Sequence, residues 1–509
     1  MESCDIVLFS PPSRMLNHYR PPVSLLYLAG YLTNHRVKAR IIDTPVKEQI
    51  RDHKFFVHYD DIISGIRSKM MEEFKKIKTE LVGVTCYSTE FDEVLQLIKD
   101  IKSVAPHVKI IVGGIHPTFI PMDFFEVKSG VDICVLGEGE VTLYELVSRL
   151  QKDLRAPLDD IKGLIYKDPL TGHVKKTPER DLVENLDDIS KPDYSLIDTD
   201  YYSNASPYSV RGCYLRSMYV LATRGCPSQC TFCVAKKIRE CAGKGNPIRI
   251  RSAESLICEL RELKAKYAID GFYFIDDMFT INKKNVHEFC ERLKEEKLNL
   301  LWGCSSKVST LDESIISAMA RSGCVQIDFG VERGSDEALN LLKKGITVKK
   351  IIEIFDLCRA YGVRTLANIL VNAPGETQKD LDDILKLLDR IRAEVVYLNI
   401  FLPFPGTEIY EKAPFKFSRQ DYSLLTRDSK FLIENYPEKF KFAQHSVDLA
   451  KWQAENYGKY NSFFRNVIFY FRFQYWKTLF FSRNKMNYVK QFYLLIREFI
   501  NQKLYFGKS

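Results

Sequence analysis

The sequence predicts an α/β protein in which two successive arrays of strand and helix patterns are followed by a helical C-terminal region. Short, β-branched apolar runs bounded by turn residues alternate with helical patterns, which is typical of buried parallel strands joined by crossover helices. The alternation stops once, at residues 153–205, and then resumes. At 509 residues the chain is long enough for two to four domains.

The first array covers residues 1–152 and contains five strand patterns, with helical patterns such as 21–32 and 91–103 between them. Five strands with crossover helices predict a doubly wound, flavodoxin-like (Rossmann-like) domain. Ligands of such sheets bind beyond the carboxyl ends of the strands. The strand patterns are Asp5–Phe9, Val37–Ile42, Leu81–Thr85, Val108–Val112 and Asp132–Leu136.

Residues 153–205 are expected to form a connector, because a hairpin-like turn signal is followed there by an Asp- and Pro-rich stretch. The second array covers residues 206–415 and contains six strand patterns. Function is expected at the carboxyl ends of these strands, as in full barrels. The strand patterns are Met218–Thr223, Phe272–Asp276, Leu298–Cys304, Val325–Gly330, Leu366–Val371 and Val395–Phe401.

Three cysteines follow the first strand pattern of the second array. Cys226, Cys230 and Cys233 have the spacing C-x3-C-x2-C. Cysteine thiolates are soft ligands that bind iron–sulfur clusters and zinc. Zinc sites usually combine two Cys/His pairs, whereas the next cysteine here, Cys241, stands alone. Three cysteines on a four-iron cluster would leave one iron open for a small molecule.

The cysteine motif, with Phe232 before its last cysteine, resembles the C-x3-C-x-aromatic-C signature of the radical S-adenosylmethionine (SAM) superfamily. The resemblance implies a [4Fe–4S] cluster on the three cysteines and SAM chelated to the open iron. It also implies reductive cleavage of SAM to a radical that abstracts hydrogen. Further strand-end motifs in family order imply that residues 206–415 form a partial (βα)6 TIM-type barrel. These motifs are Phe274-Ile-Asp276-Asp277, Trp302-Gly-Cys-Ser-Ser-Lys307, Phe329-Gly-Val-Glu332, Ala373-Pro-Gly-Glu376-Thr and Pro403-Phe-Pro-Gly-Thr407.

The resemblance implies that Phe232 and four strand-end side chains contact SAM. The carboxylates of Asp276, Asp277 and Glu332 can hold its ammonium group and ribose hydroxyls. Lys307 stands where the family often has an arginine that faces the SAM carboxylate, and lysine gives a point charge without the bidentate fork. For each acid alone, a solvated charge or a helix N-cap is the alternative interpretation.

The turns after the strands of the first array resemble those of the cobalamin-binding domain that precedes many radical SAM barrels. Glycine lets a backbone approach a ligand closely, although tight turns without a ligand are the alternative. The string Asp-x-His-x-x-Gly, whose histidine ligates cobalt in many cobalamin proteins, is absent. The resemblance therefore implies cobalamin bound without a histidine below cobalt. The implied cobalamin-binding residues are Ser88, Thr89, Gly113, Gly114, His116, Thr118, Gly137 and Glu138.

Residues 416–509 are expected to form a helical region that is aromatic and basic. Residues 451–509 contain 19 aromatic side chains and eleven Lys and Arg against two Asp and Glu, so this segment accounts for the whole chain's net charge of +8. Such a composition suits an interfacial helix at an anionic membrane. An aromatic cap on the barrel with its cations pointing outward is the equal alternative. Nucleic-acid binding ranks well behind both, because no RNA-binding motif accompanies the segment.

These features predict a cobalamin-dependent radical SAM enzyme that functionalises an unactivated carbon, by methyl transfer to a hydrophobic or lipid-like substrate. The enzymatic alternative is an oxidative cyclase of the magnesium-protoporphyrin monomethyl ester type. The alternative of another class is a non-catalytic cobalamin or redox sensor. The resemblance implies a reductant such as flavodoxin or ferredoxin. Thirteen cysteines without scaffold-like spacing and no signal peptide predict a cytoplasmic location, with the tail at the inner face of the membrane.

Overall fold

The computed structural model describes residues 2–12, 20–43, 59–189, 191–204, 210, 213, 215–427, 429–461, 468–486, 488–489 and 493. The chain forms two compact units that interleave along the sequence. The first unit comprises residues 1–201, 232–249 and 402–435, and the second comprises residues 202–231, 250–401 and 436–509. Most of the expected connector thus belongs to the first unit, and the expected C-terminal region is divided between the two.

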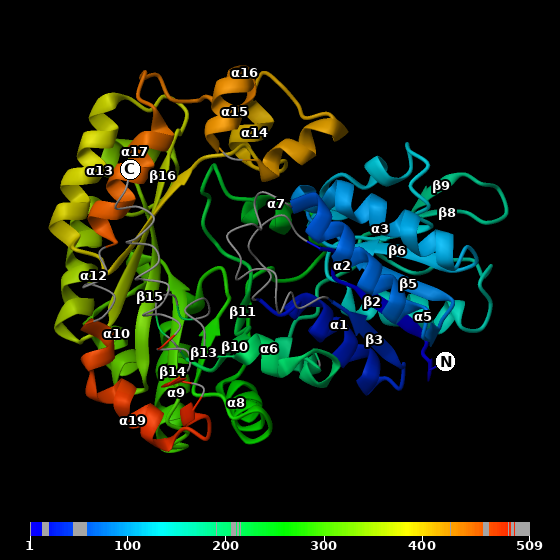
Figure 1. The fold of residues 1–509 in the computed structure, drawn as a ribbon, viewed down its shortest axis with the longest axis horizontal. Coiled ribbons are helices and arrows are strands. Elements are labelled where there is room, and N and C mark those ends of the chain that lie inside the picture. Colours follow the sequence, from blue (N-terminus) through cyan, green and yellow to red (C-terminus); the bar gives the residue numbers. More distant parts are fainter. Residues whose placement is uncertain are drawn as a thin grey trace. The chain divides into compact units, whose positions relative to one another are not determined.

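The first unit is built on a seven-stranded sheet in the order β3-β2-β5-β6-β7-β8-β9. Its first five strands are parallel, and their order is that of a flavodoxin-like fold, as the sequence predicts. The last two form an antiparallel hairpin that extends the sheet beyond β7, and this hairpin lies in the expected connector (Figure 1). The bounds are β2 Ile6–Phe9, β3 Ala39–Ile42, β5 Leu81–Thr85, β6 Lys109–Gly113, β7 Ile133–Val135, β8 Leu164–Lys167 and β9 Val174–Lys176, with a separate pair of β1 Glu2–Ser3 and β4 Ile77–Lys78.

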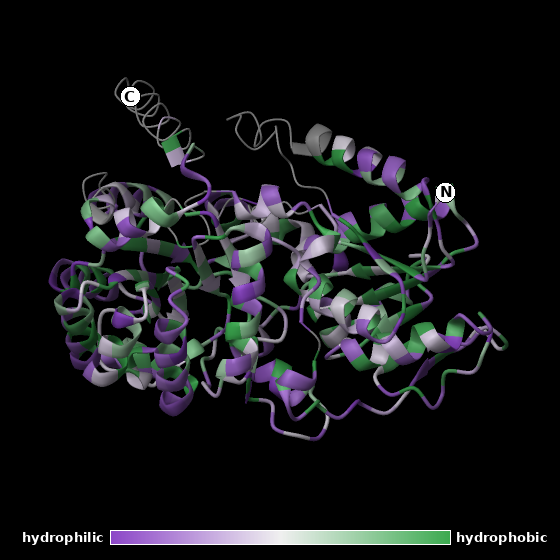
Figure 2. Ribbon diagram, turned by 90° about the horizontal axis from the view of Figure 1, so that it is seen from below, coloured by the Kyte–Doolittle hydropathy of each residue, from purple (hydrophilic) through white to green (hydrophobic). Residues whose placement is uncertain are grey.

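Crossover helices cover this sheet, and its central strands β2, β5 and β7 are buried and apolar (Figure 2). All four residues of β2 are buried, which explains the continuous apolar run in the sequence. In α3 the buried Val94, Leu97, Ile98 and Ile101 recur at the spacing of one helix face. The helices are α1 Val23–Asn34, α2 Tyr59–Phe74, α3 Phe91–Val104, α4 Ile115–Phe119, α5 Glu140–Leu150, α7 Ala235–Glu240, α14 Glu408–Lys412 and α15 Ser429–Asn435, with 3₁₀ turns η2 Ser88–Glu90, η3 Pro121–Phe124, η4 Leu186–Asp188, η5 Tyr194–Leu196 and η8 Arg419–Thr426; α6 Thr199–Ser203 crosses into the second unit.

The second unit contains six strands in the order β10-β13-β14-β15-β16-β17, all parallel. The first and last strands are edges of this sheet, so the array is a partial barrel, as the sequence predicts. The carboxyl ends of all six strands lie at one edge of the sheet because the strands are parallel. The bounds are β10 Ser217–Val220, β13 Gly271–Phe274, β14 Leu301–Ser306, β15 Cys324–Glu332, β16 Arg364–Val371 and β17 Val395–Ile400, with short strands β11 Thr223–Arg224 and β12 Arg249–Ile250.

Helices alternate with these strands, and aromatic residues fill the layer between them. The Phe272 and Trp302 rings stack with centroids 5.9 Å apart, and Phe274 stacks on Phe279 at 4.3 Å. Rings in such arrangements add stability beyond their buried area. The helices are α8 Ala253–Tyr267, α9 Lys283–Glu295, α10 Glu313–Arg321, α11 Asp336–Leu341, α12 Val348–Ala360, α13 Gln378–Ile391, α16 Pro437–Phe440, α17 Leu449–Tyr460 and α19 Phe473–Phe481, with 3₁₀ turns η6 Phe279–Ile281, η7 Val308–Thr310 and η9 Ile468–Phe471.

The aromatic run of the tail does not form one helix. The 3₁₀ turn η9 and helix α19 are separated at Arg472, whose backbone is extended and whose guanidinium donates a hydrogen bond to the Gly362 carbonyl oxygen. The beginning of the run, with Phe463, Phe464 and Arg465, lies outside the described residues. Within the described part of the chain, no helix has the length and hydropathy that crossing a bilayer requires.

Candidate active site

The cysteine loop begins directly after β11, at Gly225, whose φ of +87° favours glycine. Cys230 is buried, whereas Cys226 and Cys233 are half-buried. The backbone N–H of Ala235 donates to Cys233 Sγ at 3.5 Å. In the described ranges, no three His, Cys, Asp or Glu side chains form a site for a single metal ion. A cubane cluster does not need such a site, because each of its cysteines binds a different iron.

Two lysines lie beside the second cysteine. Burial raises the pKa of the Cys230 thiol, and the positive charges of Lys344 and Lys307 oppose that shift. Lys307 follows β14, and its Nζ donates to the hydroxyl of Ser228, inside the cysteine loop, at 3.1 Å. Burial also lowers the pKa of Lys307. The cation that the sequence proposes for the SAM carboxylate therefore lies at the cysteine loop.

Glu332 at the end of β15 pairs with the second of these lysines. Lys344 Nζ donates to Glu332 Oε1 at 2.8 Å, and both residues are buried. Glu332 has a φ of +66°, a strained conformation for a residue with a side chain. A Cβ at position 330 would lie 2.4 Å from both Glu332 Oε1 and Lys344 Nζ, so a side chain there would displace the pair from its present position. The predicted site residues do not include Lys344.

Asp276 and Asp277 follow β13 and lie in different environments. Asp276 is buried, and its Oδ1 accepts hydrogen bonds from the backbone N–H groups of Ala222 at 2.8 Å and Thr223 at 3.0 Å. It thus fixes the segment that leads into the cysteine loop. Its Oδ2 is buried without a hydrogen-bond partner among the described residues, which fits an acceptor for an ammonium or hydroxyl group of a ligand. Asp277 is exposed.

Stability should depend on pH through Asp276. Burial raises the pKa of this carboxyl from 3.8 to about 7, against the opposing amide hydrogen bonds. A raised acid pKa means that the folded state holds the proton more tightly, so the contribution of Asp276 to stability is fully present below pH 3.8 and is lost as the pH rises through about 7. At about 1.4 kcal/mol per pKa unit, the decline is a few kcal/mol at most. In the SAM-free Asp276→Asn variant, the free energy of unfolding measured in urea should decline less between pH 3.8 and about 7. An equal decline in wild-type protein and variant would contradict the raised pKa of Asp276.

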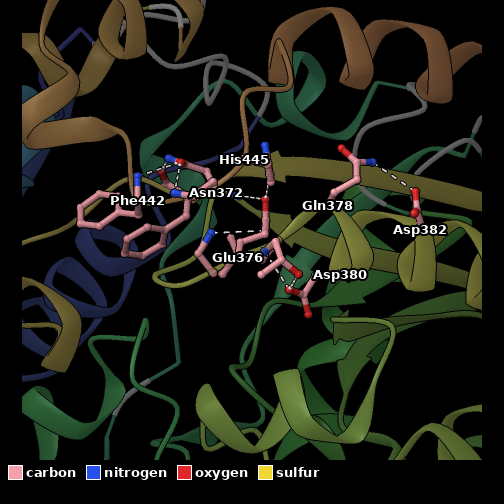
Figure 3. Close-up of polar contacts among 12 residues, drawn as sticks. Asn372, Glu376, Gln378, Asp380, Asp382, Phe442 and His445 are labelled. Atoms are coloured by element: carbon pink, nitrogen blue, oxygen red, sulfur yellow. Dashed lines mark hydrogen bonds and ion pairs between the residues drawn. The ribbon is translucent and has the colours of Figure 1, made fainter.

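Glu376 in the turn after β16 is a structural residue. Its carboxylate is buried and pairs with Arg333. It also accepts from the Asn372 backbone N–H at 3.0 Å and lies 2.9 Å from His445 Nε2 (Figure 3). The Asn372 side chain binds the same C-terminal segment, because its Oδ1 accepts from the Phe442 backbone N–H at 3.0 Å. The predicted Ala-Pro-Gly-Glu motif thus holds residues 440–445 against the barrel.

The strand-end turns of the first unit are joined by Thr118. Its hydroxyl donates to the Gly114 carbonyl oxygen at 2.7 Å and accepts from the Gly137 backbone N–H at 3.0 Å. Gly114 has a φ of +109°, and a Cβ there would lie 2.8 Å from the Cys86 carbonyl oxygen, so this glycine is needed for packing. Gly137 is exposed, and a Cβ there would meet nothing within 4 Å. The carboxyl edge of the sheet is therefore open at Gly137, beside Gly113, which is half-buried.

His116 is buried behind these turns. Its Nδ1 lies 3.0 Å from the Ser88 hydroxyl, and its Nε2 lies 3.3 Å from Asp123 Oδ2. The ring packs against Tyr422 in η8, with centroids 5.0 Å apart. Burial of Asp123 raises its pKa, but hydrogen bonds from His116, Tyr422 and Arg419 outweigh this and hold it below the ordinary value. Both ring nitrogens thus face protein groups.

Glu138 also has a protein partner. Its carboxylate forms a bidentate pair with Arg249, whose Nη1 donates to the Val183 carbonyl oxygen at 2.7 Å. The Arg249 side chain is almost completely buried. This pair holds the turn after β7, so Glu138 shapes the candidate cobalamin edge through Arg249. Thr89, the last of the predicted cobalamin contacts, is half-buried in η2.

Comparison with known proteins agrees with both units. The family model of the Radical SAM superfamily matches residues 220–388, and that of the B12 binding domain matches residues 16–147. The chain is 31% identical to an uncharacterised methyltransferase of Pyrococcus horikoshii over 420 residues, 81% of this chain and 84% of that protein. The chain belongs to the radical SAM superfamily, among members with a B12-binding domain. The cofactors of this radical SAM protein are a [4Fe–4S] cluster, SAM and cobalamin.

A further relative and a solved structure are also similar to the radical SAM protein. It is 24% identical to the anaerobic magnesium-protoporphyrin IX monomethyl ester cyclase of Rubrivivax gelatinosus, over 80% of this chain and 69% of that one. The structure of the methyltransferase TsrM from Kitasatospora setae, which contains cobalamin and a [4Fe–4S] cluster, has a TM-score of 0.61 at 19% identity and covers 80% of this chain and 77% of its own. At this identity the structural match supports the fold.

Proposed function

We propose that this radical SAM protein transfers a methyl group to an unactivated carbon of a hydrophobic or lipid-like substrate. The observation that carries the SAM chemistry is the group of charged side chains around Cys230: Lys307 from the end of β14, and the Lys344–Glu332 pair at the end of β15. The choice of methyl transfer is supported by the relative in Pyrococcus horikoshii, which is named a methyltransferase. A reduced cluster supplies radical generation from SAM, and cobalamin supplies methyl transfer. The residue assignments for both cofactors are part of this proposal.

Each charged group has a role that fits one part of SAM. Lys307, held by Ser228, is a cation for the SAM carboxylate at the cysteine loop. Glu332 and the unpartnered Oδ2 of Asp276 are acceptors for the ammonium group and the ribose hydroxyls. Phe232, half-buried beside Cys233, offers its ring or backbone to the adenine. Asp277, which is exposed, is the weaker candidate of the two aspartates.

The proposed substrate class, a hydrophobic or lipid-like molecule, follows from the radical chemistry. Radical abstraction is needed for unactivated carbons, which abound in apolar molecules, and the relative in Rubrivivax gelatinosus is named for a porphyrin ester. We further propose that a flavodoxin or ferredoxin supplies the electron, and that the enzyme works in the cytoplasm at the inner face of the membrane.

Product analysis tests methyl transfer against oxidative cyclisation. Protein reconstituted anaerobically with iron, sulfide and cobalamin should convert SAM under reducing conditions to both 5′-deoxyadenosine and S-adenosylhomocysteine, because the latter remains when SAM gives up its methyl group. Formation of 5′-deoxyadenosine alone, with bound cobalamin, would favour the cyclase instead.

Cobalamin should bind to the first unit without a nitrogen ligand from the protein. Both His116 ring nitrogens face Ser88 and Asp123, so electron paramagnetic resonance of the cob(II)alamin form should show no nitrogen superhyperfine splitting from His116. His116→Ala should leave that spectral feature unchanged, although it leaves a cavity beside Phe91 and Tyr422. Nitrogen coupling that disappears in this variant would contradict the prediction.

A further inference from the structure

The C-terminal helix α19 exposes an aromatic face. Phe473, Trp476 and Phe480 are 80%, 58% and 70% exposed, and their spacing of three and four residues puts them on one side of the helix. Phe471 before the helix and Met486 after it are 79% and 78% exposed. Isolated exposed apolar residues are common, but a contiguous group of this kind usually marks an interaction surface.

The opposite face of α19 anchors the helix to the barrel. Tyr475 and Thr478 are buried, and Ser482, directly after the helix, donates to Asp270 Oδ2 at 2.7 Å. Tyr488 donates to the same oxygen at 2.6 Å and accepts from the Arg216 backbone N–H at 2.9 Å. The helix is therefore held in place by polar contacts, and its outward aromatic face follows from that fixed orientation.

Basic residues surround the aromatic face, and acidic residues are absent from its sequence. Lys477, Arg483 and Lys485 are exposed, and Lys485 Nζ lies 5.1 Å from the centroid of the Phe480 ring. Residues 461–493 contain no Asp or Glu. An aromatic face with a basic border and no acidic residues complements a surface that is anionic and apolar beneath, which is the property of an anionic lipid bilayer.

We infer that this surface, Phe471, Phe473, Trp476, Phe480 and Met486 with Lys477, Arg483 and Lys485, docks on anionic membrane lipid. The inference rests on the proposed location at the membrane and identifies the part of the molecule that makes the contact. It requires neither cofactor nor turnover, so its test is independent of methyl transfer. The sequence left a membrane helix and a structural cap as alternatives, and α19 combines a cap on one face with a membrane surface on the other.

The anchoring contacts also locate this surface within the second unit. Asp270 precedes β13, and Gly362, which binds Arg472, precedes β16. The helix is thus attached at the amino edge of the barrel sheet, whereas the cysteine loop and Glu332 lie at the carboxyl edge. The docking surface therefore holds the enzyme at the bilayer without opening directly onto the candidate SAM site.

The fluorescence of Trp476 provides a direct test. It is the exposed one of the three tryptophans, because Trp302 and Trp452 are buried. Full-length protein should float with equimolar phosphatidylcholine–phosphatidylglycerol vesicles at low salt, with a blue shift of the Trp476 emission. It should not float with pure phosphatidylcholine, and high salt should weaken the binding. Trp476→Phe should still float but lose the spectral shift.

Variants of the two components of the surface sharpen the test. Phe473→Gln with Phe480→Gln, and separately Lys477→Gln with Arg483→Gln and Lys485→Gln, should each weaken vesicle binding by on the order of tenfold or more. Leu170→Gln, at an 81% exposed leucine of the β8–β9 turn, is the apolar control and should have no effect. Removal of three exposed lysines elsewhere, Lys266, Lys386 and Lys412, is the matched charge control and should also have none.

Three results would overturn the inference. The first is wild-type protein that ignores anionic vesicles at low salt. The second is a blue shift without lipid that grows with protein concentration alongside a dimer in sedimentation, which would make a second copy the occupant. The third is protection of Trp476 from iodide quenching in the lipid-free monomer, which would mean that other residues of this chain cover the face.

Discussion

Replacing Cys230 by alanine should reduce SAM cleavage by more than about 100-fold, because loss of even the groups that support a metal ligand costs roughly 10–100-fold. In the proposed site each cysteine of the loop would hold a different iron, so loss of one thiolate would leave the cluster with two protein ligands. Cys230 is the most buried of the three cysteines, and it lies beside Lys307 and Lys344 of the proposed SAM site. The measurement is 5′-deoxyadenosine formed by the anaerobically reconstituted protein under reducing conditions.

Cys241→Ala is the matched control, since it removes a half-buried thiol shortly after the loop and should leave SAM cleavage unchanged. Undiminished 5′-deoxyadenosine from Cys230→Ala would contradict the cluster assignment. A wild-type protein that holds a cluster and cobalamin but leaves SAM intact would favour the sensor over the enzyme. The experiment therefore separates the two functional classes that the sequence leaves open.

The architecture was predictable because it depends on local patterns. The bounds of β5 match the predicted 81–85, and α3 ends one residue beyond the predicted 91–103, since a buried strand and an amphipathic helix each have a distinct apolar period. The six strands of the barrel lie where predicted, and Lys307 and Glu332 come close to Cys230 because parallel strands carry their ends to one edge. Strand order and strand ends together were enough to place the candidate site.

The partners of the site residues were not predictable, because they come from distant parts of the chain. Asp276 binds the backbone N–H of Ala222, 54 residues earlier, and Glu376 contacts His445, 69 residues later. No local period reports such contacts. The interleaving of the units has the same origin, since residues 402–435 join the first unit through contacts such as that of Tyr422 with His116.

Glu376→Ala should destabilise the second unit by about 3–5 kcal/mol, the usual cost of removing one partner from a buried ion pair. The substitution would leave the Arg333 guanidinium, 3% exposed, without its carboxylate. The backbone N–H of Asn372 would lose its acceptor, and His445 would lose the contact that ties the C-terminal segment to the barrel. Urea unfolding followed by tryptophan fluorescence measures the effect, since all three tryptophans belong to the second unit.

Two further variants test whether the destabilisation by Glu376→Ala comes from the buried contacts of Glu376 or only from the loss of one negative charge. Asp382→Asn lies on α13, where its hydrogen bond with Gln378 is exposed (Figure 3), and should change stability by less than about 0.5 kcal/mol. Glu376→Gln keeps an acceptor for the Asn372 backbone N–H but loses the charge that pairs with Arg333. Its loss of stability should therefore fall between the losses of Asp382→Asn and Glu376→Ala. Equal stability of Glu376→Ala and Asp382→Asn would contradict a structural role for this turn. A stable Glu376→Ala protein with impaired SAM cleavage would instead place the glutamate in the catalytic machinery.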